Sequence, residues 1–208
     1  MQRVCPVTKR SKPPKQRMKN YRYFLLSLLI IALDQGIKIA VHTWMEPGYF
    51  GQIPLIGDFF KLHYTLNPGM AFGIQIGSIW GKLILTTFRI LAMFGIGYYL
   101  HSLTVKNSPW GLLVSVALIL GGAIGNLIDS VFYGVWFNNA PAGAPMQWFH
   151  GQVIDMFFAD FYEGNLPSWI PLWGGTYYST PIFNFADAAI FCGVMAILLF
   201  QNKFLTKD

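Results

Sequence analysis

The sequence predicts a membrane protein that is mainly α-helical, with four transmembrane helices and a small extracytoplasmic domain that contains β-structure. Of its 208 residues, 54% are hydrophobic and 12% are charged, against the roughly 25% charged residues of soluble domains. Four apolar segments are long enough to cross a bilayer, and one segment outside them alternates apolar and polar side chains. This composition excludes a water-soluble globular protein.

The four predicted spans cover about 24–44, 80–100, 110–130 and 183–201. Each has the length of about 20 residues that a helix needs to satisfy its own backbone across the hydrocarbon core. Trp44, Trp80 and Trp110 lie at their ends, where interfacial anchors are favoured. The first span is too long for the apolar part of a signal peptide and contains Asp34 and Lys38, so we expect a retained helix.

The basic residues predict the orientation. Eight of the 15 Lys and Arg residues lie in 1–22, and Lys106, Lys203 and Lys207 follow spans that end on the same side. The two remaining segments, about 45–79 and 131–182, contain Lys61 as their only Lys or Arg. The positive-inside rule therefore predicts a basic cytoplasmic tail, two cytoplasmic termini and one integral-membrane domain over 1–208. A basic tail of this kind is not a nucleic-acid-binding face, and no nucleic-acid partner is expected.

The two outer segments differ in pattern. Residues 60–67 alternate apolar and polar side chains, which predicts a half-buried strand that ends at the turn sequence Asn67-Pro68-Gly69. The apolar run 70–76 then leads back to the membrane. The second outer segment is rich in Gly, Pro, Asn and aromatic residues, and we expect loops there.

Three ionisable side chains inside the predicted spans need partners or a use, because charges in a bilayer are costly. Asp34 and Lys38 stand four residues apart on one helix face, and a structural ion pair is favoured over catalysis. Arg89 has no carboxylate in its own helix. It requires either a carboxylate of a neighbouring helix or a backbone carbonyl.

Three carboxylates are predicted to converge at the outer leaflet. Asp129 ends the third span, Asp187 begins the fourth, and Asp155 lies in an apolar stretch between them. Asn126 and Asn184 precede the two helical Asp residues by three positions, so an amide can orient each acid. Two close carboxyl groups can share a proton and act as acid and base on water. The alternative is that these residues only cap helices and satisfy loop amides.

Other chemistry has weaker support. The four histidines (His42, His63, His101 and His150) are dispersed, without the spacing of a metal site. Ser78 and Lys82 have the spacing of a nucleophile and its base, but a helix-cap serine beside a snorkelling lysine is favoured. Gly121, Gly122 and Gly125 indicate close helix packing rather than a nucleotide loop.

From about 33 to 190 the chain resembles the lipoprotein signal peptidases, also called signal peptidase II. Three elements carry the resemblance: NPGMAFG at 67–73, GGAIGNLID at 121–129 and FNFADAAI at 183–190. They are similar to the family elements NxGxAF, GGxxGNxxD and FNxAD, and GQVID at 151–155 lies between the last two. The order of the elements on a four-span chain makes the resemblance specific.

The resemblance implies an aspartic endopeptidase that cuts prolipoproteins before a diacylglyceryl-modified cysteine. It implies that Asp155 and Asp187 are the catalytic pair, that membrane lipids are partners, and that no metal or other cofactor takes part. It also implies an enzyme of the bacterial cytoplasmic (inner) membrane, with its active site near the outer leaflet. A monomer is the simplest expectation, although the sequence does not determine the oligomeric state. The supporting and substrate-binding residues it implies are Asp34, Lys38, Asn67, Gly69, Asn126, Asp129 and Asn184.

Two features depart from the family pattern. Ser130 stands where the family usually has Arg, so Lys61 and Lys82 are the candidates to supply the missing charge. The loops at 131–150 and 160–181 are longer than in the family and could form a lid or a partner surface. Two other functions compete with the peptidase: a transporter or proton channel that uses the buried charges as a relay, and a non-catalytic scaffold descended from the peptidases.

Overall fold

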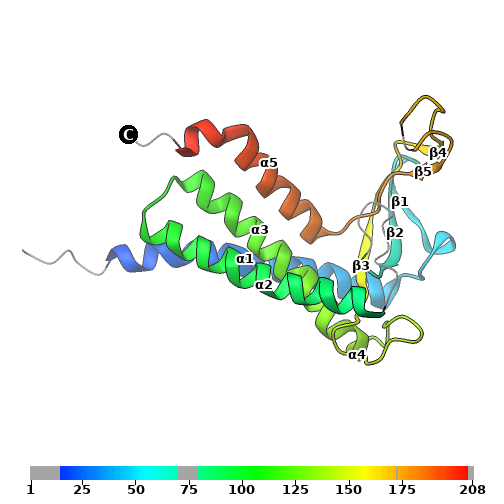
Figure 1. The fold of residues 1–208 in the computed structure, drawn as a ribbon, viewed down its shortest axis with the longest axis horizontal. Helices are drawn as coiled ribbons and strands as arrows, with labels where there is room; N and C mark the ends of the chain where they lie inside the picture. The colour runs from blue at the N-terminus through cyan, green and yellow to red at the C-terminus, as the bar shows by residue number, and fades with distance from the viewer. Residues whose placement is uncertain (1–14, 70–78, 172, 206–208) are drawn as a thin grey trace, which may run out of the picture.

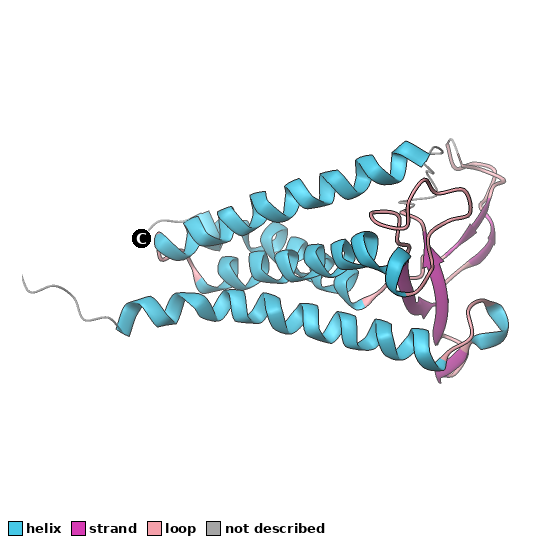
Figure 2. Ribbon diagram, turned by 90° about the horizontal axis from the view of Figure 1, so that it is seen from below, coloured by secondary structure: helices cyan, strands magenta, loops and turns pink. Residues whose placement is uncertain are grey.

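The computed structural model describes residues 15–69, 79–171 and 173–205. The N-terminal part of the basic tail, the apolar run 70–76, Ser78 and Lys207 therefore lie outside the described residues. Four long helices run along the long axis of the molecule, and the strands gather at one end of them (Figures 1 and 2). The start of the first helix and the end of the last lie together at the opposite end (Figure 1).

The four long helices confirm the predicted spans. They are α1 (Lys15–Trp44), α2 (Ile79–Val105), α3 (Trp110–Ile128) and α5 (Phe185–Leu205). By length and hydropathy, each contains a segment able to cross a bilayer: Tyr21–Trp44, Trp80–Val105, Trp110–Trp136 and Phe185–Phe204. Many of the large apolar side chains on their outer faces are exposed in the isolated chain, as lipid-facing residues are.

The third span is longer than predicted. After Ile128 the helix continues through a π-helical turn, η2 (Asp129–Tyr133), and a short helix, α4 (Gly134–Trp136). The loop that follows packs directly on this extension, because a Cβ on Gly134 would lie 2.0 Å from the backbone oxygen of Gln147. The prediction that the helix ends near 130 was therefore wrong by about one and a half turns, since these contacts keep it helical to Trp136.

Helix α3 lies at the centre of the bundle, and its glycines allow this, as predicted. A Cβ on Gly121 would lie 2.9 Å from the backbone oxygen of Ser27 in α1, and one on Gly122 would lie 2.4 Å from that of Ala186 in α5. Small residues at such positions let membrane helices approach closely. The apolar core at the far end of the bundle is built from Tyr23, Leu100, Leu103, Leu113, Val116, Ala117 and Leu120.

The end of the bundle opposite the start of α1 and the end of α5 carries two antiparallel sheets. The larger has the order β1 (Ile53–Ile56), β2 (Phe60–Asn67) and β3 (Val153–Ala159), and a one-turn helix, η1 (Tyr49–Gly51), precedes it. The smaller pairs β4 (Glu163–Asn165) with β5 (Tyr177–Ser179). The alternation at 60–67 predicted β2 with its observed bounds.

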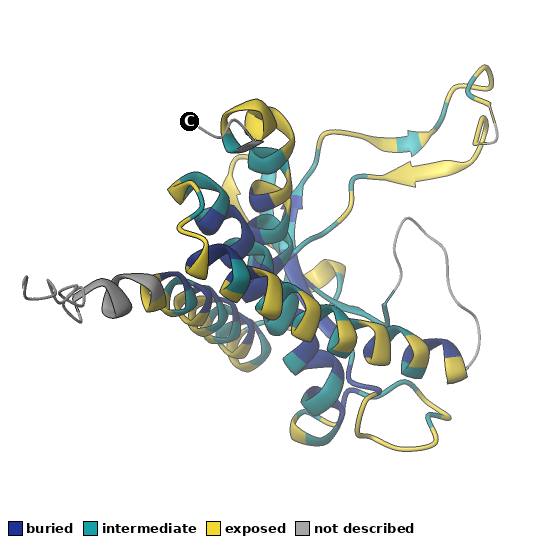
Figure 3. Cartoon of the chain, turned by 60° about the vertical axis from the view of Figure 1, so that its left-hand side comes forward, coloured by how far each residue is buried: buried dark blue, intermediate teal, exposed yellow. Residues whose placement is uncertain are grey.

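The expectation of loops throughout 131–182 was wrong, since three strands form there. Strand β3 is buried along most of its length, so its sequence is almost continuously apolar and does not show the alternation of a half-buried strand. It is held to the helices by an apolar cluster of Val41, Tyr64, Tyr133, Ile154 and Met156. The β4–β5 hairpin, in contrast, projects from the body and is largely exposed (Figure 3).

Candidate active site

Asp155 lies in the middle of β3, opposite Thr65 of β2, and is 2% exposed. Its two carboxyl oxygens accept from two amides: Oδ2 from Asn67 Nδ2 at 3.0 Å and Oδ1 from Asn184 Nδ2 at 2.6 Å. Burial, and then the negative charge of Asp187, raise the pKa of Asp155 to about 7. A carboxyl group in this state can hold a proton near neutral pH.

Asp187 lies in the first turn of α5, where a capping box fixes it. Asn184 Oδ1 accepts the backbone N–H of Asp187 at 2.9 Å, and Asp187 Oδ2 reaches back to the backbone N–H of Asn184 at 3.4 Å. Asp187 Oδ1 accepts from Asn126 Nδ2 at 2.7 Å. The start of a transmembrane helix therefore positions this carboxyl group.

Two asparagines join the carboxyl groups into one network. Asn184 Nδ2, which donates to Asp155, also donates to Asn126 Oδ1 at 3.1 Å. Asn126 in turn donates to Asp187. The prediction that each amide orients the acid three residues later is confirmed for Asn184 and Asp187, but it was wrong for Asn126. Asn126 serves Asp187 rather than Asp129, because the helix contacts across the bundle decide the pairs.

A cluster of buried charged side chains is hydrogen-bonded to this network. Lys38 Nζ lies 2.8 Å from Asp34 Oδ2 and 2.7 Å from Asp129 Oδ2, and all three side chains are fully buried. The predicted pair of Asp34 and Lys38 is confirmed. Lys38 also donates to Asn126 Oδ1 at 3.1 Å, and this bond connects the cluster to the amide that holds Asp187.

Asp129 has a structural role and is not part of the pair of Asp155 and Asp187. Besides Lys38, its carboxylate accepts from Gln35 Nε2 at 2.9 Å and from the backbone N–H of Ile154 at 3.3 Å. These bonds tie α3 to α1 and to β3. The sequence left the three outer Asp residues equivalent, and the contacts separate them.

Asp34 also reaches α5, since its Oδ1 accepts the backbone N–H of Ala186 at 2.9 Å. A carboxylate at a helix N-terminus satisfies an otherwise unpaired donor and interacts favourably with the helix dipole. Gln35 donates to the same carboxylate, and Tyr133 donates to Gln35 Oε1 at 2.9 Å. Neither Gln35 nor Tyr133 was predicted from the sequence. The only available signal was that Gln35 is a polar residue beside Asp34 in an apolar span.

Asn67 and Gly69 form a tight turn at the end of β2. Asn67 Oδ1 accepts the backbone N–H of Gly69 at 2.8 Å while its Nδ2 holds Asp155. Gly69 has φ +104, and a Cβ there would lie 2.6 Å from Leu85 Cδ2. Glycine is required on both grounds. Residues 70–73 of the same sequence element lie outside the described residues.

The positive charge beside Ser130 comes from Arg89. Its Nη1 donates to Ser130 Oγ, which donates to the backbone oxygen of Asn126 at 2.9 Å. Arg89 also interacts electrostatically with Asp187, Asp129 and Asp155. The prediction that Lys61 supplies this charge was wrong, because Lys61 pairs with Asp160 at 3.4 Å. Arg89 found a side-chain hydroxyl rather than a backbone carbonyl, and its charge faces carboxylates of other elements.

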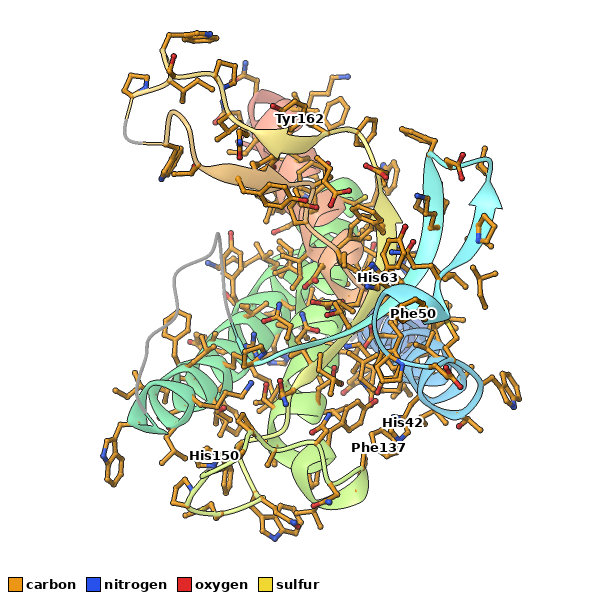
Figure 4. All side chains as sticks on the ribbon, turned by 90° about the vertical axis from the view of Figure 1, so that its right-hand side faces the viewer. His42, Phe50, His63, Phe137, His150 and Tyr162 are labelled. Atoms are coloured by element: carbon orange, nitrogen blue, oxygen red, sulfur yellow. The ribbon has the colours of Figure 1, made fainter. Side chains whose placement is uncertain are left out.

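His42, His63 and His150 lie apart from one another in the structure (Figure 4). His42 contacts the Tyr64 hydroxyl at 2.8 Å and stacks on Phe137, and His63 contacts Gln52 at 2.9 Å. Among the residues that the structure describes, no three His, Cys, Asp or Glu side chains are grouped to hold a metal ion.

The geometry fits a known family. The sequence profile of the family described as Signal peptidase (SPase) II matches residues 26–203. The chain belongs to the signal peptidase II family. This family comprises the lipoprotein signal peptidases, aspartic peptidases that cleave signal peptides from prolipoproteins. Membership decides against the transporter or channel.

Relatives in other bacteria extend the match over most of the chain. The lipoprotein signal peptidase of Amoebophilus asiaticus is 50% identical over 183 residues, which are 87% of this chain and 78% of the relative. That of Porphyromonas gingivalis is 42% identical over 186 residues, 84% of this chain and 80% of the relative. A solved bacterial membrane enzyme shares the fold of this signal peptidase II, with TM-score 0.58 and 24% identity over 88% of each chain.

Proposed function

We propose that this enzyme removes the signal peptide from diacylglyceryl-modified bacterial prolipoproteins, cutting before the lipid-bearing cysteine, with Asp155 and Asp187 as its catalytic pair. The observation that carries this proposal is the placement of Asn184. Its side chain bonds both to the carboxyl group of Asp155 and to the backbone of Asp187, so carboxyl groups from β3 and α5 share one network. Two such groups in a buried setting are suited to acid and base catalysis.

The two carboxyl groups have opposite roles in proton transfer: one acts as the acid and the other as the base. Asp155, with its pKa raised to about 7 by burial and by the charge of Asp187, starts protonated. Asp187, in the first turn of α5, is assigned the role of the base. Asp187 takes a proton from water as the water oxygen attacks the scissile carbonyl carbon, and Asp155 gives its proton to the carbonyl oxygen.

Breakdown of the resulting gem-diol restores the enzyme. Asp187 gives its new proton to the amide nitrogen of the cysteine, and the carbon–nitrogen bond breaks. Asp155 takes a proton from a hydroxyl of the gem-diol, which becomes the carboxyl group of the released signal peptide. Asp155 is then protonated and Asp187 ionised, as at the start, so one water is consumed and no other reactant is needed.

The membrane positions the substrate in this mechanism. The strands that carry Asn67 and Asp155 lie at one end of the four helices (Figure 2), and the positive-inside rule assigns this end to the outer leaflet. Both termini are then cytoplasmic. The acyl chains hold the modified cysteine at the interface, and this proximity contributes several kcal/mol toward the barrier. A precursor without lipid is therefore cut poorly. The proposed mechanism needs no metal or other cofactor.

The test uses purified enzyme reconstituted with a diacylglyceryl prolipoprotein. Asp155→Asn and Asp187→Asn keep the size of the side chain and remove its proton chemistry, and each is expected to lower kcat about 1000-fold, roughly 4 kcal/mol. Asp160→Asn is the matched control, because Asp160 pairs with Lys61 outside the network. Cleavage at the wild-type rate by either variant removes that residue from the pair. Activity is expected to survive a chelator, and its loss contradicts metal independence.

A further inference from the structure

Lys82 in α2 has a buried side chain that the proposed mechanism does not use. The residue is 8% exposed, and its Nζ makes no hydrogen bond or ion pair in the described part of the chain. The other lysines near the site are paired: Lys38 with two carboxylates and Lys61 with Asp160. The expectation that Lys82 snorkels to water was wrong. A buried ammonium group without a partner among the described residues is unfavourable, and a bound oxygen acceptor would pair it.

The Lys82 ammonium group lies close to the proposed catalytic pair. A Cβ on Gly69 would lie 3.6 Å from Lys82 Nζ. The backbone N–H of Gly69 donates to Asn67, and Asn67 donates to Asp155. The ammonium group and Asp155 therefore both lie beside the Asn67–Gly69 turn.

The first turns of α2 are fixed against the rest of the protein. Thr86 Oγ1 donates to the backbone oxygen of Lys82 at 2.9 Å and to that of Phe149 at 3.0 Å. Leu85 packs against Gly69. The backbone of Lys82 is thus held in place before any ligand arrives.

The depth of Lys82 in the membrane identifies the class of acceptor. Trp80, 69% exposed, begins the apolar span two residues earlier, and Ile84 and Phe88 present exposed apolar side chains further along. Tryptophan at the start of a span marks the interface, and the glycerol ester groups of lipids lie just inside it. The ammonium group therefore lies at the depth of ester carbonyl oxygens, on the side of α2 that faces the protein.

We propose that Lys82 binds an ester carbonyl oxygen of the diacylglyceryl group on the substrate cysteine. This inference rests on the proposed function, in which that cysteine is cut at its amino side. The lipid is attached next to the scissile bond, and the ammonium group lies next to the turn that holds Asp155. Binding pairs the buried cation and fixes the scissile bond against the carboxyl groups. Lys82 is thus a positioning residue that recognises the lipid through its ester.

The test compares two lipidated substrates that differ only in the carbonyl groups. One peptide carries the diacylglyceryl thioether on its cysteine, and the other carries a dialkylglyceryl thioether, in which ether links replace the esters. Wild-type enzyme in neutral detergent is expected to cleave the ester substrate with a kcat/KM about 10–100-fold above that of the ether substrate, as for a hydrogen bond to a charged donor.

The variants identify the residue responsible. Lys82→Met is expected to cut both substrates at the rate that the wild type shows for the ether, with the change mainly in KM. Lys82→Arg is expected to restore most of the ester preference. Lys61→Met is the matched control and is expected to keep it in full, because Lys61 pairs with Asp160. The thermal midpoint of Lys82→Met is expected to equal or exceed that of the wild type, since an unpaired buried cation has been removed.

Four outcomes overturn the proposal. An ester preference that survives in Lys82→Met removes Lys82 from lipid recognition. A lower thermal midpoint with an unchanged ester-to-ether ratio assigns Lys82 a structural role instead. A defect that appears only in vesicles with anionic phospholipid identifies a phospholipid phosphate as the ligand. Equal cleavage of ester and ether by the wild type refutes this inference and leaves the proposed function intact. Failure of the wild type to cleave either lipidated substrate refutes the proposed function itself.

Discussion

The two sheets at the outer end of the molecule differ in how they are held. Strand β3 pairs with β2 along its length, is bridged to Phe183, and packs on α1 and η2 through Ile154 and Met156. The β4–β5 hairpin contains mostly contacts of its own, such as the bond from the Tyr162 hydroxyl to the backbone oxygen of Asn165 at 2.6 Å. Its strands are largely exposed (Figure 3).

The difference shows where this fold fixes side chains and where it does not. Every polar side chain of the proposed site is bonded to an element far away in the sequence, so a change at one residue reaches several others. The hairpin makes few such bonds, and substitutions there are expected to stay local.

The largest expected effect on stability is at Lys38. Lys38→Met leaves Asp34 and Asp129 buried without their cation, and breaking a buried pair in this way costs about 3–5 kcal/mol. Thermal unfolding of the purified enzyme in detergent measures the loss. Lys61→Met, at a partly exposed pair with Asp160, is expected to cost less than about 1 kcal/mol. Equal losses in the two variants contradict the distinction between fixed and local regions.

The second effect is a dependence of stability on pH. The pKa of Asp155 is raised from its ordinary value of 3.8 to about 7 by burial and by the charge of Asp187. The protonated form is thus favoured in the folded state, and its stabilising contribution is full below pH 3.8 and is lost as the pH rises through about 7. Between pH 5 and 8.5 we expect the enzyme to lose roughly 2–4 kcal/mol of stability through this group.

Thermal midpoints measured across that pH range test the assignment. Asp155→Asn is expected to flatten the pH dependence and to exceed the wild type in stability at pH 8.5. Asp160→Asn is the control and is expected to keep the wild-type slope. A slope that is unchanged in Asp155→Asn shows that another group is responsible.

The third prediction compares an asparagine of the proposed site with an asparagine of the β4–β5 hairpin. Asn184→Ala removes the bonds to Asp155, to Asn126 and to the backbone of Asp187, and we expect kcat to fall about 10–100-fold because both carboxyl groups lose an orienting partner. Asn165→Ala in β4 is expected to leave kcat within about twofold and stability within about 0.5 kcal/mol. Steady-state kinetics on the lipidated substrate measure both. If Asn165→Ala were the more damaging change, the contrast between the sheets would be wrong.

Patterns local in the sequence predicted local features well. Alternation predicted β2 with its bounds, four-residue spacing predicted the pair of Asp34 and Lys38, and the small residues of α3 predicted close helix contacts. The spacing of the Asp and Asn residues likewise indicated a convergent polar site at the outer end.

The partners inside the site could not be predicted in this way. Which amide meets which acid depends on how α3, α5 and β3 pack, and a spacing of three residues within one segment does not encode that. Arg89 is an example of a contact that spacing could not predict, because it bonds to Ser130, a residue 41 positions further along the sequence. Strand β3 was missed for a related reason: burial on both faces removes the alternation that reveals a strand.

The capping box that begins α5 has a consequence for biogenesis. Asp187 takes its position only when Asn184 has started the helix, and α5 is the final helix in chain order. While the polypeptide is being inserted into the bilayer, the earlier spans and β3 therefore hold one acid without its companion. With Asp155 and Asp187 as the proposed catalytic pair, hydrolysis therefore awaits the insertion of α5.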